Sequence, residues 1–245
     1  MNKQYQRVLV TTPHPLLRLV CLGLVTFSFP LFSLELTRFG TLLAPLWFPT
    51  SIMMVAFYRH AGKMRPGIAL ACSFGNIFAS WMLFSWASLN ITYTAINIIE
   101  ATVGALLLRK LLPWYNPLQN LNDWVRLALG SALVPPLVGG VLVHFLVPSA
   151  EPLRNFLVWV LSEAIGALAL VPLGLLFKPH YLLRHRNPKL LLETLVTLVV
   201  TLVLSWTAIT WLPWPFTCII VLLMWSAVRL PRMEAFLIFL FTIMM

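Results

Sequence analysis

The stretch from Leu89 to Leu108 reads LNITYTAINIIEATVGALLL and is followed by the basic pair Arg109-Lys110. About 20 residues are needed for a helix to cross the roughly 30 Å hydrocarbon layer of a bilayer, and this stretch has that length. Its residues do not alternate between apolar and polar, as those of a membrane β-strand would. Because the bilayer interior cannot satisfy open backbone groups, the stretch predicts a transmembrane helix.

Similar stretches fill most of the chain. Of its 245 residues 60% are hydrophobic and only 10% are charged, whereas a soluble domain has roughly 25% charged residues. No room is left for a separate soluble catalytic domain of about 100 residues. The predicted spans run from about Leu16 to Leu36, Leu42 to Phe57, Gly67 to Trp86, Leu89 to Leu108, Trp124 to Val147, Phe156 to Phe177, Leu191 to Leu212 and Pro215 to Val228.

A ninth apolar stretch, Ala235 to Met245, is too short to cross a bilayer and has no polar residue after it. We therefore predict an all-α, polytopic integral membrane bundle of eight complete transmembrane helices and a truncated ninth. Residues 1–15 are expected to be a cytoplasmic N-terminal segment. Residues 16–245 are expected to form one membrane domain that is incomplete at its C-terminus, with no soluble catalytic domain.

The basic residues give the orientation of these spans. Lys and Arg are retained in cytoplasmic loops, and here all of them but Arg38 and Arg154 fall in connections on one side of the predicted membrane. This places the N-terminus in the cytoplasm. The net charge of +10 therefore marks the ends of spans; it does not indicate a nucleic-acid partner, which needs a solvated basic face.

Four polar side chains lie well inside predicted spans: Asn76, Asn97, Glu100 and Glu163. A rise of about 1.5 Å per residue puts Glu100 roughly 16 Å and Glu163 roughly 10 Å from the outer ends of their spans. A carboxylate at the centre of a membrane helix costs about 2.5–3.5 kcal/mol even on the lenient insertion scale. We expect the four to converge at similar depth and to face one another or a hydrated cavity.

Two interpretations of these residues remain open. Polar side chains can join helices by hydrogen bonds, each worth about 0.6–2 kcal/mol; this suits the amides of Asn76 and Asn97. Glu100 and Glu163 carry a cost that an amide would avoid, so a role in binding a ligand, a proton or an ion is equally consistent.

Proline and glycine mark the other irregular places. Pro49, Pro135, Pro136 and Pro172 are expected to break or kink their spans, either to improve packing or to open a hydrated pocket beside Gly139 and Gly140. Gly166 would allow a neighbouring backbone to come close. Most tryptophans, Trp47 and Trp159 among them, fall near predicted outer ends, where the aromatic belt of a membrane protein lies.

Motifs for metal or cofactor binding do not occur in the sequence. The cysteines Cys21, Cys72 and Cys218 are isolated in apolar runs, and no His-Glu-x-x-His or phosphate-binding loop is present. We expect no metal, no cofactor and no catalytic residue.

Several of these stretches resemble a known family. They are APLWFPTSIMMVAF from Ala44, Gly75-Asn76, NIIEATVGALLLR from Asn97 and EAIGALALVP from Glu163. Together they resemble the membrane-associated sensor (MASE) domain of the first type. Its motif residues would be Asn76, Asn97, Glu100 and Glu163, with Trp47, Pro49, Gly166 and Pro172.

The resemblance implies a sensory input module of the bacterial inner membrane, which in the family precedes cytoplasmic diguanylate cyclase or histidine kinase domains. The cyclase signature Gly-Gly-Asp-Glu-Phe is absent, because Gly139-Gly140 is followed by Val141. Expected partners are the lipid bilayer, an unknown small signal or ion, and a second copy or another signalling protein. A multi-span transporter or channel and a purely structural anchor remain as alternatives.

Overall fold

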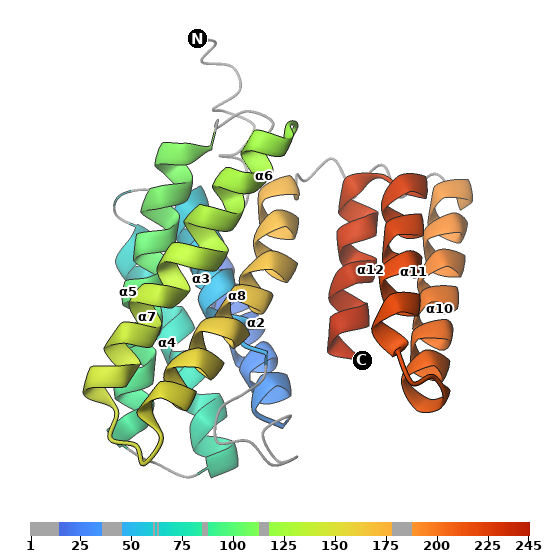
Figure 1. The fold of residues 1–245 in the computed structure, drawn as a ribbon. Helices are drawn as coiled ribbons and strands as arrows, with labels where there is room; N and C mark the ends of the chain where they lie inside the picture. Colours follow the sequence, from blue (N-terminus) through green and yellow to red (C-terminus); the bar gives the residue numbers. More distant parts are fainter. Residues whose placement is uncertain are drawn as a thin grey trace, which may run out of the picture.

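The computed structural model describes residues 15–35, 46–60, 62, 64–84, 88–112, 118–177 and 188–245. These residues are almost all helical (Figure 1). The helices are α2 (Pro15–Glu35), α3 (Pro49–Arg59), α4 (Met64–Phe84), α5 (Ser88–Leu111), α6 (Leu121–Leu127), the π-helix η2 (Ala128–Leu133), α7 (Val134–Leu146), α8 (Pro152–Leu176), α10 (Pro188–Trp211), α11 (Pro215–Arg229) and α12 (Arg232–Met244).

Six helical segments among the described residues are long and apolar enough to cross a membrane. They agree with the predicted all-α, multi-pass architecture, and α11 is a shorter apolar helix beside them. The six segments are Leu16–Glu35, Met64–Leu83, Leu89–Leu111, Leu121–Leu146, Pro152–Leu176 and Pro188–Trp211.

The helices lie in two neighbouring groups (Figure 1). Helices α2 to α8 form a bundle around α3, and α10, α11 and α12 stand side by side next to it. The contact between the groups is made by α12, which packs against α8. At the end of the bundle where α6 begins, the rings of Trp124 and Phe236 stack with centroids 5.2 Å apart.

Within the described part of the predicted second span, Leu42 to Phe57, the helix begins at Pro49. Leu46, Trp47 and Phe48 are not helical, and residues 42–45 lie outside the described residues. With 11 residues α3 is about 16 Å long, roughly half the thickness of the hydrocarbon layer. Proline is favoured in the first turn of a helix because it has no N–H to leave unpaired there, and Pro49 starts α3 in this way.

The predicted fifth span is one continuous helical rod that contains a π-helical stretch. Residues Ala128–Leu133 are π-helical, and Pro135 and Pro136 follow in the first turn of α7. A proline inside a helix clashes with the carbonyl one turn earlier and lacks an N–H, so a wider turn accommodates the pair. The predicted interruption is therefore a change in helix type. Likewise, α8 continues as a helix through Pro172.

Arginines at one end of the bundle bind the carbonyl groups where helices end. Arg109 of α5 donates hydrogen bonds to the carbonyl oxygens of Phe57, Tyr58 and His60, at 2.7, 2.8 and 2.8 Å. Last-turn carbonyls have no partner within their own helix, and a cation is favoured there by the helix dipole. Arg126 does the same for Leu111 and Arg59 for Phe177, and Arg232 donates to the carbonyl oxygen of Leu118, which lies shortly before α6.

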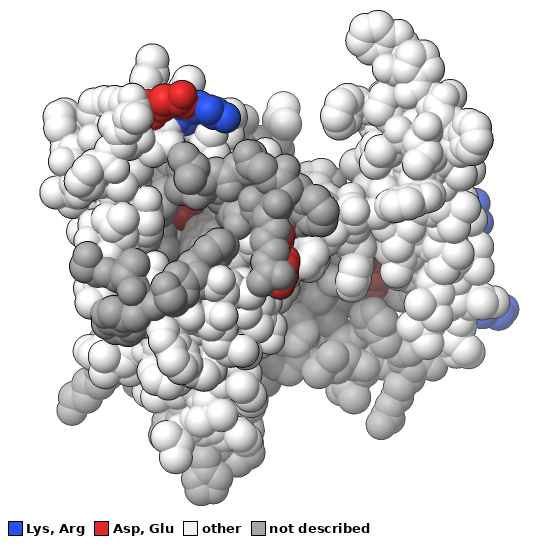
Figure 2. Space-filling model, turned by 90° about the horizontal axis from the view of Figure 1, so that it is seen from below, with Lys and Arg blue, Asp and Glu red and all other residues white. Residues whose placement is uncertain are grey.

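The opposite end of the molecule is different. Seen from that side, the described surface carries few charged side chains (Figure 2). Glu151 and Arg154 form an exposed ion pair there, at 2.8 Å. Arg59, Arg109 and Arg126, which the sequence assigned to the cytoplasmic side, thus bind carbonyl groups at the ends of neighbouring helices, whereas Arg229 forms an ion pair with Glu193.

Close packing of α2 on α4 depends on Gly75. A Cβ atom at this position would lie 2.7 Å from the Gly23 oxygen and 3.0 Å from the Phe27 nitrogen, both of which are backbone atoms. We predict that Gly75→Ala lowers the free energy of unfolding in detergent by about 1–3 kcal/mol, because a backbone cannot yield as a side chain can.

The measurement is thermal unfolding in detergent, and Gly67→Ala is its matched control. Its Cβ would meet only the tip of the Leu19 side chain, at 3.2 Å, so we expect a change within about 0.5 kcal/mol. Equal effects of the two substitutions would show that α2 and α4 are not packed as described.

Candidate functional site

The carboxyl group of Glu163 lies at the start of α3. Thr50 Oγ1, in the first turn of α3, donates a hydrogen bond to Glu163 Oε1 at 2.8 Å. Next to it, the Trp47 backbone N–H donates to the Ser162 carbonyl oxygen at 3.3 Å. The positive end of the α3 dipole is thereby brought to a carboxyl group of α8, an arrangement that favours negative charge.

The carboxyl group of Glu100 lies between α5, α7 and α8. Trp159 Nε1 of α8 donates a hydrogen bond to Glu100 Oε2 at 3.1 Å. Gly139 of α7 makes room for the pair, since a Cβ atom there would lie 2.0 Å from Glu100 Oε2 and 2.7 Å from Trp159 Nε1. Gly139 is thus in direct contact with side chains, and Gly140 similarly faces Val160 and Phe156.

The two carboxyl groups are neighbours near the middle of the membrane. Trp159, which donates to Glu100, lies four residues before Glu163 on α8, so the two α8 side chains share one face of the helix. Counted from the first residues of α5 and α8, Glu100 lies about 18 Å and Glu163 about 16 Å along its helix. The estimate of roughly 10 Å for Glu163 was counted from Phe156, whereas α8 begins at Pro152, one turn earlier.

The cluster is incompletely hydrogen-bonded. Asn97, Glu100 and Glu163 are 0%, 1% and 2% exposed. Among the described residues, Glu100 Oε1 and both amide atoms of Asn97 have no hydrogen-bond partner. Buried polar groups in native proteins are nearly always satisfied. The site therefore combines two acidic groups with further polar atoms that can still accept or donate hydrogen bonds.

Asn76 of α4 is bonded to α5, about two turns of that helix away from Glu100. Its Nδ2 donates to Thr94 Oγ1 at 3.1 Å, and Thr94 Oγ1 in turn donates to the Asn90 carbonyl oxygen at 2.7 Å. This chain joins α4 to α5 as an interhelical hydrogen bond does in membrane bundles. Asn76 is thus buried, as are the other three, but its hydrogen bond is made away from the two carboxyl groups.

Two of the predicted packing residues lie at the start of α3. Pro49 is the first residue of α3, and Gly166 of α8 faces the residue pair before it: a Cβ atom at Gly166 would lie 1.9 Å from the Trp47 carbonyl oxygen. Pro135, Pro136 and Pro172 are buried in α7 and α8.

Two residues that hold the carboxyl groups were not singled out from the sequence. Trp159 was expected in the aromatic belt, and this was wrong: it is buried and its ring N–H is directed at Glu100. Thr50 carried no signal of its own except its place directly after Pro49.

A further buried carboxyl, Glu234 at the start of α12, has both oxygens without a partner among the described residues.

The described residues contain no cluster of three or more His, Cys, Asp or Glu side chains that could hold a metal ion. Two carboxyl groups with a threonine hydroxyl, an indole N–H and an amide are instead suited to a proton, a monovalent cation or a small polar ligand.

A multi-pass helical domain with acidic groups enclosed at mid-membrane is typical of integral membrane sensors and transporters. Residues 17–245 match the family model of MASE1, so the chain belongs to the MASE1 family of membrane sensor domains. Over its full length it is 77% identical to the probable diguanylate cyclase DgcE of Escherichia coli (strain K12), and it spans 22% of that protein, at the N-terminus. No solved structure matches the chain.

We predict that the two hydrogen-bonded carboxyl groups act as one unit. Thr50→Val and Trp159→Phe each remove the donor to a buried carboxyl oxygen and should each lower the free energy of unfolding by about 1–3 kcal/mol. Because the carboxyl groups are neighbours, the double variant should differ from the sum by at least about 0.5 kcal/mol.

Thr194→Val provides the control for this double-mutant cycle. Thr194 donates only to its own helix, at Leu190, and lies on α10, so its effect should add to that of Thr50→Val. If the Thr50 and Trp159 effects were also additive, the carboxyl groups would be independent and the site would be two separate hydrogen bonds.

Proposed function

We propose that this MASE1 domain is the input module of a signalling protein and that its signal acts at the Glu100–Glu163 pair. The observation that carries the proposal is the placement of two neighbouring carboxyl groups at mid-membrane, with one Glu100 oxygen lacking a partner and Glu163 bonded to the start of a half-length helix. The signal is a small ligand, a proton or an ion. Its binding shifts the domain between two states by its differential affinity for them.

The element that moves is α3. Its first turn is bound to Glu163 through Thr50, and its last carbonyls are bound by Arg109 of α5. A short helix held at both ends by side chains of other helices transmits a displacement from the centre of the membrane to its surface. A change in the charge or hydrogen bonding of Glu163 would therefore alter the position of the Arg109 cap.

A second contact leads from the start of α3 to the C-terminal helix. Phe48, directly before α3, is buried in one cluster with Ala169 and Leu173 of α8 and Leu240 of α12. In the relative, which is about five times longer than the matched part, the rest of the chain follows this region. The packing of Phe48 thus supports a path from the carboxyl pair to α12 and onward to an output domain.

The topology that we propose has eight crossings of the bacterial inner membrane, with the N-terminus and residues 1–15 in the cytoplasm and residues 16–245 as the sensor domain. In this topology α3, together with the non-helical residues before it, makes the second crossing, and α11 makes the eighth. The arginine caps at one end of the bundle and the scarcity of charge at the other support this orientation. A second copy of the domain or another signalling protein is the expected partner.

We predict that Glu100→Gln and Glu163→Gln, made in a complete cyclase that carries this domain, change cyclic di-GMP output by about fivefold or more, as expected for a coupling of at least about 1 kcal/mol. The amide keeps the shape of the side chain and removes its ability to ionise. Nucleotide output would be compared at equal protein level across growth conditions.

Glu151→Gln is the matched control, because it removes an exposed carboxylate at the end of the bundle opposite the arginine caps, away from the carboxyl pair. Output should then be unchanged. If all three variants retained the output and its response, the carboxyl pair would be structural only. If an unrelated membrane anchor replaced the whole domain without loss of regulation, the domain would be an anchor.

A transporter is the second candidate, favoured by α3 alone: a half-length helix whose positive end lies at mid-membrane is a common feature of transporter substrate sites. In that case proteoliposomes should show proton or cation flux that Glu100→Gln lowers by about tenfold or more, and that Glu151→Gln leaves intact. A sensor should show no flux above that of empty vesicles.

A further inference from the structure

A groove between α2, α3 and α4 lies apart from the carboxyl pair. It has a volume of about 370 Å³, within the range of roughly 300–1,000 Å³ for small-molecule sites. The described residues that line it are Arg18, Leu19, Cys21, Leu22 and Val25 of α2, Ala56 and His60 at the end of α3, and Met64 and Ile68 of α4.

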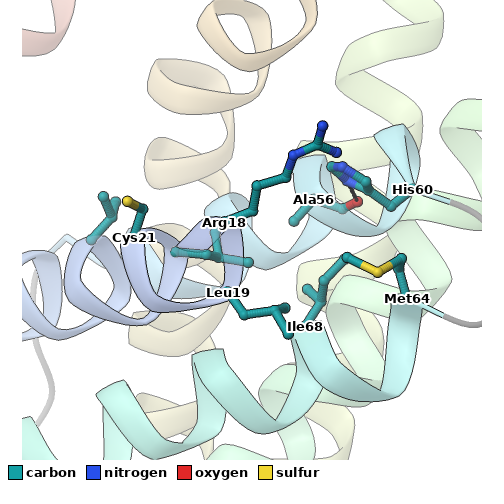
Figure 3. Close-up of a pocket in the computed structure, with 9 residues that line it drawn as sticks. Arg18, Leu19, Cys21, Ala56, His60, Met64 and Ile68 are labelled. Atoms are coloured by element: carbon teal, nitrogen blue, oxygen red, sulfur yellow. Dashed lines mark hydrogen bonds between the residues drawn. The ribbon is translucent and has the colours of Figure 1, made fainter. Parts of the chain in front are cut away.

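The groove has a polar end and an apolar end. The side chains of Arg18 and His60 point toward one another at one end, where Met64 lies beside His60, and Leu19 and Ile68 lie further along (Figure 3). His60 is the residue directly after α3, and its Nδ1 is 3.1 Å from the Ala56 carbonyl oxygen. Among the described lining residues none is acidic.

The polar end of the groove lies at the membrane surface, where α2 begins and α3 ends. Arg18 lies three residues after the first residue of α2, so it is only about 4–5 Å along the helix, within reach of the headgroup layer for a long basic side chain. The same end of the bundle carries the arginine caps of Arg109 and Arg126. Below it, Leu22 and Val25 border the groove along α2 toward the hydrocarbon.

We propose that this groove binds one anionic phospholipid of the adjacent leaflet, with its phosphate at Arg18 and His60 and an acyl chain along Leu19, Leu22 and Ile68. A basic end and an apolar length match the two parts of such a molecule, and basic pockets between transmembrane helices on the cytoplasmic side are known to hold anionic headgroups. Phosphatidylcholine also has a phosphate group, but its headgroup is zwitterionic, so a basic end favours the anionic lipid over it.

A lipid bound in this groove would contact the end of α3 at the membrane surface. The groove is bordered by the last turn of α3 at Ala56 and by its C-cap His60, and α3 begins at the carboxyl pair. A lipid in the groove would brace the surface end of α3 against α2 and α4. Lipid composition would then affect the domain without any contact with Glu100 or Glu163, and lipid binding does not depend on those residues.

The test is native mass spectrometry of the purified protein after equilibration with phosphatidylglycerol or phosphatidylcholine. The unaltered protein should retain one phosphatidylglycerol in preference to phosphatidylcholine. Arg18→Gln should lower that retention about fivefold, the equivalent of about 1 kcal/mol for one basic residue. Arg154→Gln, at the opposite end of the bundle, should leave it unchanged.

A second pair of variants tests the apolar part. Val25→Trp fills the groove from a position 41% exposed, whereas Val20→Trp alters a residue of α2 that is 51% exposed and does not line it. Only Val25→Trp should reduce retention, and both proteins should fold because both positions are exposed.

The proposal would be overturned if phosphatidylcholine were retained equally well, or if Arg18→Gln and Val25→Trp behaved as their controls do. It would also be overturned if Val25→Trp abolished a dimer and left the lipid count unchanged, since the occupant would then be a second copy of the chain.

Discussion

A carboxyl group at the centre of a hydrocarbon layer must be satisfied by the protein that surrounds it, and the described bundle is arranged around two such groups. Glu163 requires a donor, and α3 starts where Thr50 can supply one. Glu100 requires another, which Trp159 supplies, and Gly139 leaves the space for both side chains. The position of α3 and the glycine at position 139 thus serve the same requirement, that each buried carboxyl group has a hydrogen-bond donor.

The same constraint explains why the irregular parts of the backbone are where they are. Open backbone groups at membrane depth are tolerated only when buried in protein. The residues before α3 meet this condition, because Trp47 is bonded to Ser162 and lies on Gly166. At the other end of α3, Arg109 binds carbonyls that the helix cannot satisfy itself. Both ends of α3 therefore depend on other helices, which makes α3 suited to transmit a change at Glu163.

Much of the architecture was predictable because a membrane imposes length and hydrophobicity on each span. Six spans, their all-helical nature and the burial of Asn76, Asn97, Glu100 and Glu163 follow from that physics. The half length of α3 was not predictable, because the residues directly before it are as apolar as those of a transmembrane helix. Trp159 was assigned to the aromatic belt because hydropathy cannot tell an indole that meets lipid headgroups from one that meets a buried carboxyl.

By itself the sequence determined that this is a multi-pass helical membrane domain with acidic groups inside it, because span length, charge and the cost of a carboxyl in lipid are properties of single segments. Only the tertiary structure decided which of the polar residues meet. It placed Glu100 and Glu163 together and left Asn76 with Thr94, because those distances depend on how α3, α5, α7 and α8 pack, and residues 50 and 163 are brought together by the fold alone.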